Sequence, residues 1–230
     1  EYWRAIGLPY PDGIAGTGPG GKVTKDDVLA AAGSNGSGSG PAPDRDEKVL
    51  RGPAGMLAKA MNESRSIPTA TSFRTVAVDM LDAKRKGLNA ALSERGMEVS
   101  FTHLVAWAIV LAARQWPVMA RHYEDRDGKL YSVSDNAVNL GIAVDVEKKD
   151  GSRALMVPAV KGADTMDFVT FHASYEELIT RTRENRLTPD DFAATNITLT
   201  NPGGIGTVAS VPRLMAGQGT IVAAGSIAYP

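Results

Sequence analysis

The stretch VNLGIAVDV, from Val138 to Val146, decides the fold. Its apolar residues stand at every second position: Val138, Leu140, Ile142, Val144 and Val146. Because successive side chains of a strand point to opposite faces, this alternation predicts a strand with one buried face. The turn sequence KKDG at 148–151 follows, and a returning strand is predicted at 154–160. Pro158 cannot donate a ladder hydrogen bond, so it indicates an edge position or a bulge in that second strand.

Helical patterns flank this hairpin. A helix that is buried nearly all round is predicted from Phe101 to Gln115, because apolar residues fill most of its sides. The residues at helical spacing are Phe101, Leu104, Val105, Ala108 and Ala112, and the other sides carry Trp107, Ile109 and Val110. A second, amphipathic helix is predicted from Phe168 to about Arg186, and Thr188 and Pro189 are typical of the start of a short third one. Further strands are predicted at 74–80, 197–200 and 220–228, so the sequence indicates an α/β (α+β) layered domain.

The composition argues against several classes of protein. The 230 residues are 43% apolar and 22% charged with a formal net charge of -1, which is unlike a nucleic-acid binder with a basic surface. There is no cysteine, so no disulfide framework or thiolate metal site is expected, and no other metal-ligand cluster is apparent. The longest apolar run, Leu104 to Ala113, is shorter than the about 20 residues that span a membrane. No secretory signal opens the chain, and a cytoplasmic location is expected.

One change of composition divides the chain. Residues 33–43 read GSNGSGSGPAP, and such a run cannot bury enough apolar surface to offset the entropy lost on ordering. We therefore predict a head at 1–32, a flexible tether at 33–47 and a body at 48–230. The clearest feature of the head is the segment GTGPGGKVTKDDVL at 16–29, in which Thr24 is expected to cap a helix together with Asp27.

The segment 16–29 resembles the peripheral subunit-binding domain of 2-oxoacid dehydrogenase acyltransferases. That family docks the dehydrogenase or decarboxylase subunits through basic residues of this region, so the resemblance implies that Lys22 contacts a partner protein. The first helix departs from the family pattern, because the segment from Glu1 to Leu8 lacks the usual run of Ala and Arg.

The body resembles the catalytic domain of the same acyltransferases. The segments that carry the resemblance are 51–68, 100–117, 138–145, 156–161 and 196–206. The segment SVPRLMAGQG at 210–219 is similar to a segment of the acyltransferase-like domain of actinobacterial multifunctional 2-oxoglutarate dehydrogenases. In those proteins this domain is fused to a thiamine-dependent dehydrogenase. The resemblance implies a chloramphenicol-acetyltransferase-like mixed sheet behind a small helical module, a homotrimer-based assembly, and acyl transfer between dihydrolipoamide and coenzyme A. No lipoyl-bearing hairpin is visible in this sequence.

Such chemistry needs a base for a thiol and hydrogen-bond donors for the oxyanion of a tetrahedral intermediate. In the family the base is the histidine of an HxxxDG motif, reached across a trimer interface. None of the three histidines, His103, His122 and His172, has that spacing, so each is interpreted as structural and the motif is expected beyond Pro230. The fragment alone is therefore expected to be inactive or nearly so. The family places a Ser or Thr hydroxyl toward the oxyanion at the position that matches Thr200.

Two other interpretations stay open. The acyltransferase-like fold can serve as a non-catalytic assembly or docking domain that positions a dehydrogenase. Alternatively, the chain is a stand-alone acyltransferase for a non-lipoyl acceptor. Only the subgroup resemblance favours a succinyl group, because the sequence does not place the residues that bind coenzyme A or select one acyl group over another.

Overall fold

The structure of the chain is a computed structural model that describes residues 15–27, 47, 49–147, 151 and 153–227. By its internal contacts the chain divides into two compact units, Glu1–Val49 and Leu50–Pro230. Most of the predicted tether lies outside the described residues, as do the segment 1–8 and the end of the predicted head helix. The boundaries of head, tether and body therefore stay predictions.

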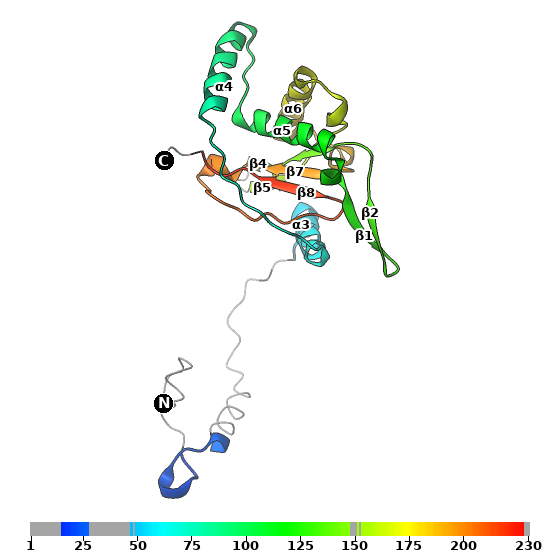
Figure 1. Cartoon of the computed structure of the whole chain (residues 1–230). Coiled ribbons are helices and arrows are strands. Elements are labelled where there is room, and N and C mark those ends of the chain that lie inside the picture. The colour runs from blue at the N-terminus through cyan, green and yellow to red at the C-terminus, as the bar shows by residue number, and fades with distance from the viewer. Residues whose placement is uncertain (1–14, 28–46, 48, 148–150, 152, 228–230) are drawn as a thin grey trace. The chain divides into compact units, whose positions relative to one another are not determined.

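The larger unit combines helices with short strands (Figure 1). Its described α-helices are α3 (Gly52–Glu63), α4 (Asp79–Leu92), α5 (Phe101–Gln115) and α6 (Phe168–Arg183). Its described strands are β1 (His122–Arg126), β2 (Lys129–Val133), β3 (Leu140–Ile142), β4 (Val144–Glu147), β5 (Arg153–Met156), β6 (Ala159–Val160), β7 (Ile197–Thr200) and β8 (Thr220–Ala223). Short 3₁₀ helices lie at Ser64–Ser66, Ser93–Arg95, Pro117–Ala120, Ala163–Thr165, Pro189–Phe192 and Pro202–Ile205. In the described part of the chain, no helix has the length and apolar character needed to cross a bilayer.

A four-stranded mixed sheet forms the centre of this unit, with the strand order β6-β3-β7-β8. The pairs β3–β7 and β7–β8 are parallel, whereas β6 is antiparallel to β3. The long strand predicted at 138–146 divides at Ala143, since β3 belongs to this sheet and β4 pairs with β5 in a separate ribbon. Pro158 lies at the matching break between β5 and β6, where its carbonyl accepts a hydrogen bond from the Ile142 amide at 2.8 Å.

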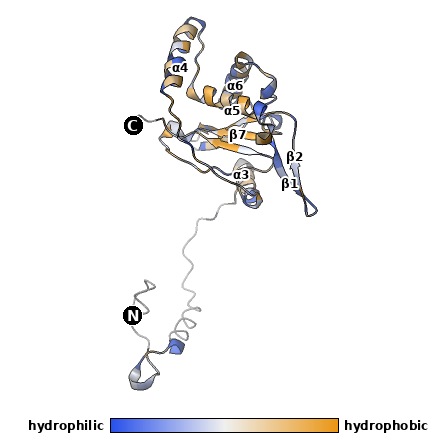
Figure 2. Ribbon diagram, in the orientation of Figure 1, coloured by the Kyte–Doolittle hydropathy of each residue, from blue (hydrophilic) through white to orange (hydrophobic). Residues whose placement is uncertain are grey.

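Helices α5 and α6 cover one face of the sheet, and α3 lies on the other side in Figure 1. The core between sheet and helices is apolar and includes Ala106, Val110, Leu140, Phe171, Ile197 and Leu199. Figure 2 shows hydrophobic residues concentrated on α5 and β7, whereas the β1–β2 hairpin is more hydrophilic. Each fully buried Leu, Ile or Phe side chain stabilises such a layer by about 1.5–3 kcal/mol. The predicted mixed α/β architecture is confirmed.

Helix α5 has the predicted bounds but is not buried nearly all round. Its buried residues are His103, Ala106, Ile109, Val110 and Ala113. Ala108 and Leu111 are exposed, so one side of this helix faces solvent. Because apolar residues lie on nearly every side of this helix, their spacing selects no stripe, and the sheet and α6 decide which side is buried.

The strand predicted at 74–80 is wrong. This segment pairs with no described strand, and helix α4 begins at Asp79. Val76 is 71% exposed, so the alternating residues have no layer to pack against. Alternation favours a strand only where a neighbouring strand satisfies the main-chain hydrogen bonds.

Two buried asparagines, Asn139 and Asn196, form a pair that joins the strands at one end of the sheet. Asn139 Nδ2 donates to the Ala194 carbonyl at 2.8 Å, and Asn139 Oδ1 accepts from the Gly162 amide at 2.9 Å. Asn196 Oδ1 accepts from the Asn139 amide at 3.0 Å, and Asn196 Nδ2 donates to the Ala137 carbonyl at 2.8 Å. The side chains of the asparagine pair thus satisfy main-chain groups that would otherwise be buried without partners.

The main chain of the asparagine pair extends this link. The Asn139 carbonyl accepts from the amides of Asn196 and Ile197, and the Asn196 carbonyl accepts from the Gly219 amide at 2.9 Å. Gly162 follows β6 and Ile197 begins β7, whereas the other partners precede β3, β7 or β8. One cluster therefore fixes the relative position of all four strands.

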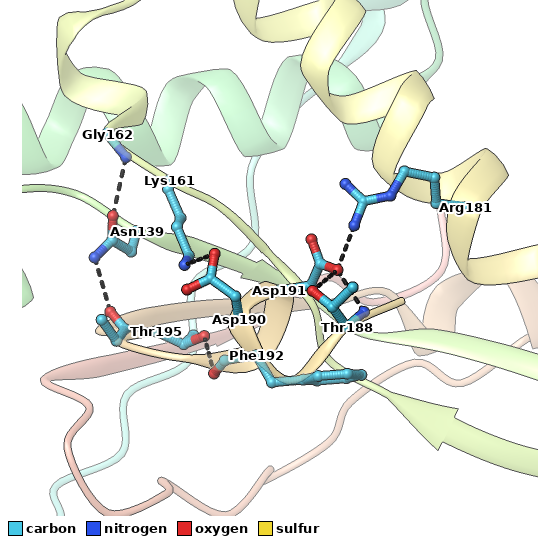
Figure 3. Close-up of polar contacts among 10 residues, drawn as sticks. Asn139, Lys161, Gly162, Arg181, Thr188, Asp190, Asp191, Phe192 and Thr195 are labelled. Atoms are coloured by element: carbon cyan, nitrogen blue, oxygen red, sulfur yellow. Dashed lines mark hydrogen bonds and ion pairs between the residues drawn. The ribbon is translucent and has the colours of Figure 1, made fainter. Parts of the chain in front are cut away.

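The loop before β7 contains the short helix that the sequence predicts from Thr188, and side chains anchor it to two other elements (Figure 3). Asp191 accepts a hydrogen bond from the Thr188 amide at 2.7 Å and also pairs with Arg181 of α6. Asp190 pairs with Lys161, which follows β6, with 2.7 Å between nitrogen and oxygen. These contacts hold the loop that leads into β7 and thereby the place where this strand begins.

Replacement of Asn196 by alanine is expected to lower the free energy of unfolding by about 2–5 kcal/mol, because each buried main-chain group left unpaired costs about 1–3 kcal/mol. Urea denaturation followed by circular dichroism measures this change. Asn62→Ala on the exposed side of α3 is the matched control and should change the free energy by no more than about 0.5 kcal/mol. Similar values for the two variants would contradict the role of the asparagine pair.

Candidate functional site

Thr200 ends the central strand β7 and is half-buried. Its carbonyl accepts a hydrogen bond from the Ala224 amide at 2.9 Å, whereas its hydroxyl forms no hydrogen bond with a described residue. Thr198, two positions earlier and hence on the same face, is buried and donates its hydroxyl proton to Gln218 Oε1 at 2.9 Å. Leu199 points the other way, into the core under α5 and α6. The face of β7 turned away from these helices therefore carries two hydroxyls. That of Thr198 is hydrogen-bonded, whereas that of Thr200 has no hydrogen bond to a described residue.

In the turn after Thr200, the main chain at Gly203 packs directly against the main chain at residues 224–225. The 3₁₀ helix Pro202–Ile205 follows the strand, and the Gly203 amide donates to the Ala224 carbonyl at 3.1 Å. A Cβ on Gly203 would lie 2.3 Å from the carbonyl oxygen of Gly225, which is closer than any side chain can approach. Glycine at this position therefore allows the chain after β8 to pass directly beside the turn and fixes the end of β7.

A cavity of about 910 Å³ lies on the helix side of the sheet. The start of α5, one side of α6 and the segment 142–145 line it, and Leu199 and Asn201 contribute from the end of β7. Asn201 Nδ2 donates to the Thr102 hydroxyl at 2.8 Å across one wall. Thr200 is not among the lining residues, because alternate positions of a strand face opposite sides. The cavity and the Thr200 hydroxyl therefore belong to opposite faces of the sheet.

All three histidines are buried, and each has a side-chain or main-chain partner. His122 begins strand β1, and its Nε2 is 2.9 Å from Glu124 Oε1. His172 of α6 donates from Nε2 to the Glu98 carbonyl at 2.9 Å. Each of these rings is thus held by a neighbour, and His172 lines the cavity on the helix side of the sheet.

His103 occupies the third position of α5 and forms a capping box with Ser100. The Ser100 amide donates to His103 Nδ1 at 3.1 Å, and His103 Nε2 lies 2.7 Å from Glu176 Oε1. Burial, and then the nearby His172, hold the pKa of His103 below its usual value, so the ring is neutral near pH 7. Burial also raises the pKa of Tyr175, whose ring packs edge-on against His103, to about 12.

The tertiary structure brings together three possible metal ligands that the sequence does not reveal. One ligand atom each from His103, His172 and Glu176 lies within 4.8 Å of the others. The residues come from two helices that meet only in the folded chain, so no sequence spacing could have indicated the cluster.

In the smaller unit, Lys22 is exposed and closes a tight glycine loop. The Gly18 amide donates to the Lys22 carbonyl at 3.0 Å around the 3₁₀ turn Pro19–Gly21. A Cβ on Gly16 would lie 2.4 Å from the carbonyl carbon of Lys22, so the chain passes too close to itself for a side chain there. The loop therefore presents the Lys22 side chain to solvent on a defined main chain.

Asp27 connects this loop to the helical turn at 25–27. Its carboxylate accepts hydrogen bonds from the Thr24 amide at 2.7 Å, the Thr17 amide at 3.0 Å and the Thr17 hydroxyl at 2.7 Å. The Asp27 amide lies 3.4 Å from the Thr24 hydroxyl oxygen, so the capping predicted for this pair is confirmed. These donors, the Thr24 amide first, hold the pKa of the Asp27 carboxyl well below its usual range.

The larger part of the chain matches a known protein family. The model of the 2-oxoacid dehydrogenases acyltransferase (catalytic domain) family matches residues 43–230. The chain belongs to this family. Within the acyltransferase family, the curated relatives that it matches include the multifunctional 2-oxoglutarate metabolism enzymes of Mycobacterium sp. strain JLS and of Mycolicibacterium vanbaalenii.

The first of these acyltransferase relatives is 46% identical over 211 residues, which are 90% of this chain and 17% of the relative. The second is 47% identical over 193 residues, which are 84% of this chain and 16% of the relative. The chain therefore spans about a sixth of the length of these curated relatives.

Solved acyltransferase cores share the fold. The dihydrolipoamide acetyltransferase of Azotobacter vinelandii, in which a serine, a histidine and an asparagine were investigated for their role in catalysis, aligns with a TM-score of 0.67. It is 22% identical, and the match covers 81% of this chain and 78% of that one. A truncated catalytic core from Thermoplasma acidophilum aligns with a TM-score of 0.68 at 24% identity, covering 80% of this chain and 81% of that one. The acyltransferase-core fold expected from the sequence is confirmed.

The loop that presents Lys22 should be sensitive to acid through Asp27. Because the folded pKa of this carboxyl is depressed, its stabilisation is complete above the ordinary value of about 3.9 and is lost as the pH falls from there toward the folded pKa. We expect Asp27→Asn to shift the amide resonances of Thr17 and Thr24 at pH 7, whereas the exposed neighbour variant Asp26→Asn leaves them in place. A pH titration by nuclear magnetic resonance measures both effects, and unchanged resonances in Asp27→Asn would contradict the role of this carboxylate.

Proposed function

We propose that the chain is the acyltransferase domain of a multifunctional protein of 2-oxoglutarate metabolism, and that it moves a succinyl group between dihydrolipoamide and coenzyme A. Family membership supports acyl transfer. The names of relatives that are 46–47% identical support the 2-oxoglutarate pathway and hence a succinyl group. The observation that carries the proposal is the hydroxyl of Thr200, which no described residue engages, at the end of the central strand.

Thr200 is proposed as the donor to the oxyanion that forms when a thiolate attacks the thioester carbonyl. A donor is most effective when its position is set before the reaction, because no reorganisation is then needed. The packing of Gly203 against Gly225 and the Thr200–Ala224 hydrogen bond provide such a fixed position. The Azotobacter enzyme, with its investigated serine and histidine, supports a hydroxyl residue in this chemistry.

The base is proposed to be a histidine that the 230 residues do not contain. No histidine of the chain has the HxxxDG spacing. His103 and His172 line the cavity on the helix side of the sheet, and His122 lies in the β1–β2 hairpin with Glu124 as its partner. The 230-residue chain alone is accordingly proposed to have little or no acyltransferase activity.

A second copy of the chain is proposed to cover the Thr200 face and complete the site in a homotrimer. The segment just after β7 exposes apolar side chains that a monomer would leave in water: Ile205 is 86%, Val208 81% and Val211 63% exposed. Exposed apolar residues gathered in one segment favour a protein interface. The similarity in fold to multienzyme cores fits this assembly.

In a longer protein that contains this chain, Thr200→Ala should lower kcat by about 10²–10³ with a small change in KM, because a lost oxyanion donor affects the transition state alone. Coenzyme A-dependent acyl transfer to dihydrolipoamide measures this change. Thr200→Ser keeps the hydroxyl and should retain most of the activity.

Thr170→Ala, at an exposed position of α6, is the matched control and should leave kcat unchanged. The same assay on the 230-residue chain should give a rate close to background. Full activity of Thr200→Ala would contradict the proposed donor, and a rate for the 230-residue chain equal to that of the longer protein would contradict the missing base.

The exposed segment Ile205–Val211 also supports a second candidate, a non-catalytic assembly domain. Both candidates predict self-association, so activity separates them. If Thr200→Ala and the wild type both lack transferase activity in the longer protein while the assembly forms, the assembly function is favoured.

Lys22 is proposed to contact a dehydrogenase or decarboxylase component through its charge. Lys22→Glu should weaken binding of that component at least about tenfold at low salt. A charge at the edge of an interface acts mainly on the rate of association and on the orientation in which the partners dock. Surface plasmon resonance at two salt concentrations measures this effect. The same change at Lys84 of α4 is the control, and equal affinity of the Lys22 and Lys84 variants would contradict docking through Lys22.

A further inference from the structure

His103, His172 and Glu176 form a cluster at the cavity on the helix side of the sheet, away from the Thr200 face. Their candidate ligand atoms lie within 4.8 Å of one another. The two imidazoles are buried, at 5% and 6% exposure, whereas the Glu176 side chain is 51% exposed. We propose that this histidine–glutamate cluster binds a zinc ion.

The ligand set suits this metal. Neutral imidazoles and a carboxylate are zinc ligands, and sites with three protein ligands keep a fourth position for water. The exposed Glu176 side chain and the cavity of about 910 Å³ give the ion a path to the cluster and room for that water.

Neighbouring groups hold the two imidazole rings of the histidine–glutamate cluster in place. His172 Nε2 lies 2.9 Å from the Glu98 carbonyl, and a carbonyl can only accept, so Nε2 carries the proton and Nδ1 keeps a lone pair. A backbone carbonyl that accepts from the other ring nitrogen is a common outer partner of a metal-ligating histidine. The ring of Tyr175, 4.5 Å from His103 between centroids, limits the motion of the second imidazole.

His103 must change its tautomer on binding. The Ser100 amide donates to Nδ1, so the proton of the neutral ring stands on Nε2, which faces Glu176 at 2.7 Å. Zinc at Nε2 takes the place of that proton, and the ring then carries its proton on Nδ1 and gives up the Ser100 amide bond. Zinc binding therefore competes with part of the α5 cap, and we expect weaker binding than in a structural zinc site with four protein ligands.

The charge of the cavity wall favours a cation. Carboxylates of Glu98, Asp145 and Glu176 line it, and the guanidinium of Arg183 is the cation that lines it among the described residues. Asp145 is paired with Arg153, so the carboxylates of Glu98 and Glu176 exceed the charge of Arg183. This excess of negative charge attracts a divalent cation and adds to the effect of the ligands themselves.

Isothermal titration of the 230-residue chain with Zn²⁺ at pH 7 tests the proposal. We expect one ion per chain, and His172→Asn and Glu176→Gln should each weaken binding at least about tenfold. Titration with Co²⁺, followed by visible absorption, should give a ligand-field band that both variants lose. Glu176→Gln changes a half-exposed position, so it keeps the test valid if the buried His172→Asn variant does not fold.

Two matched variants change the same residue types outside the cluster. Glu177→Gln alters the next carboxylate of α6, and His122→Asn alters the third histidine, which has Glu124 as its acidic neighbour. Both should bind Zn²⁺ as the wild type does, with folding checked by circular dichroism. Absence of saturable binding, equal affinity in the two cluster variants and the wild type, or loss of binding in a matched variant would each overturn the proposal.

Discussion

The fold depends on the buried hydrogen bonds of the asparagine pair, Asn139 and Asn196. Their side chains pair main-chain groups at the ends of strands that come from distant parts of the sequence. A hydrogen bond inside a protein adds about 0.5–1.5 kcal/mol, but a buried polar group without a partner costs about 1–3 kcal/mol. The pair therefore acts mainly by excluding other arrangements: a shift in the register of β3 against β7 would leave several buried groups unpaired.

This constraint gives β7 two faces with different surroundings. Ile197 and Leu199 face the core, where α5 and α6 also form the cavity that holds the histidine–glutamate cluster. Thr198 and Thr200 face the other side, and the segment after the strand exposes apolar side chains to water. The proposed thioester chemistry and the proposed zinc site can thus share one strand without sharing a cavity.

Exposed ion pairs contribute much less to this arrangement. Arg153 pairs with Asp145 across β4 and β5 at 2.5 Å, but both side chains are about half or more exposed. Such surface pairs stabilise a protein by about 0–1 kcal/mol. The half-buried pair of Arg181 with Asp191 differs because the same carboxylate also caps the short helix before β7 and so fixes a loop that leads to the central strand.

The sequence by itself determined the elements whose pattern is local. Alternation at 138–146, the bounds of α5, the caps at Thr24 and Thr188, and the hydroxyl-bearing strand at 197–200 all follow from neighbouring residues, and the resemblance of whole segments indicated the family. Tertiary structure alone decided the features that depend on neighbouring elements. It decided which side of α5 is buried and left the segment 74–80 without a strand beside it. It also ended β3 before Ala143 and began β4 after it. It also decided the candidate sites. His103 and Glu176 meet only when two helices pack on one sheet. A strand pattern shows that Thr200 and Leu199 point to opposite faces, but it does not show which face borders a cavity. The physical reason is that a residue sequence encodes the direction of each side chain along its own element, whereas burial, pairing and ligand geometry depend on elements that are distant in the chain.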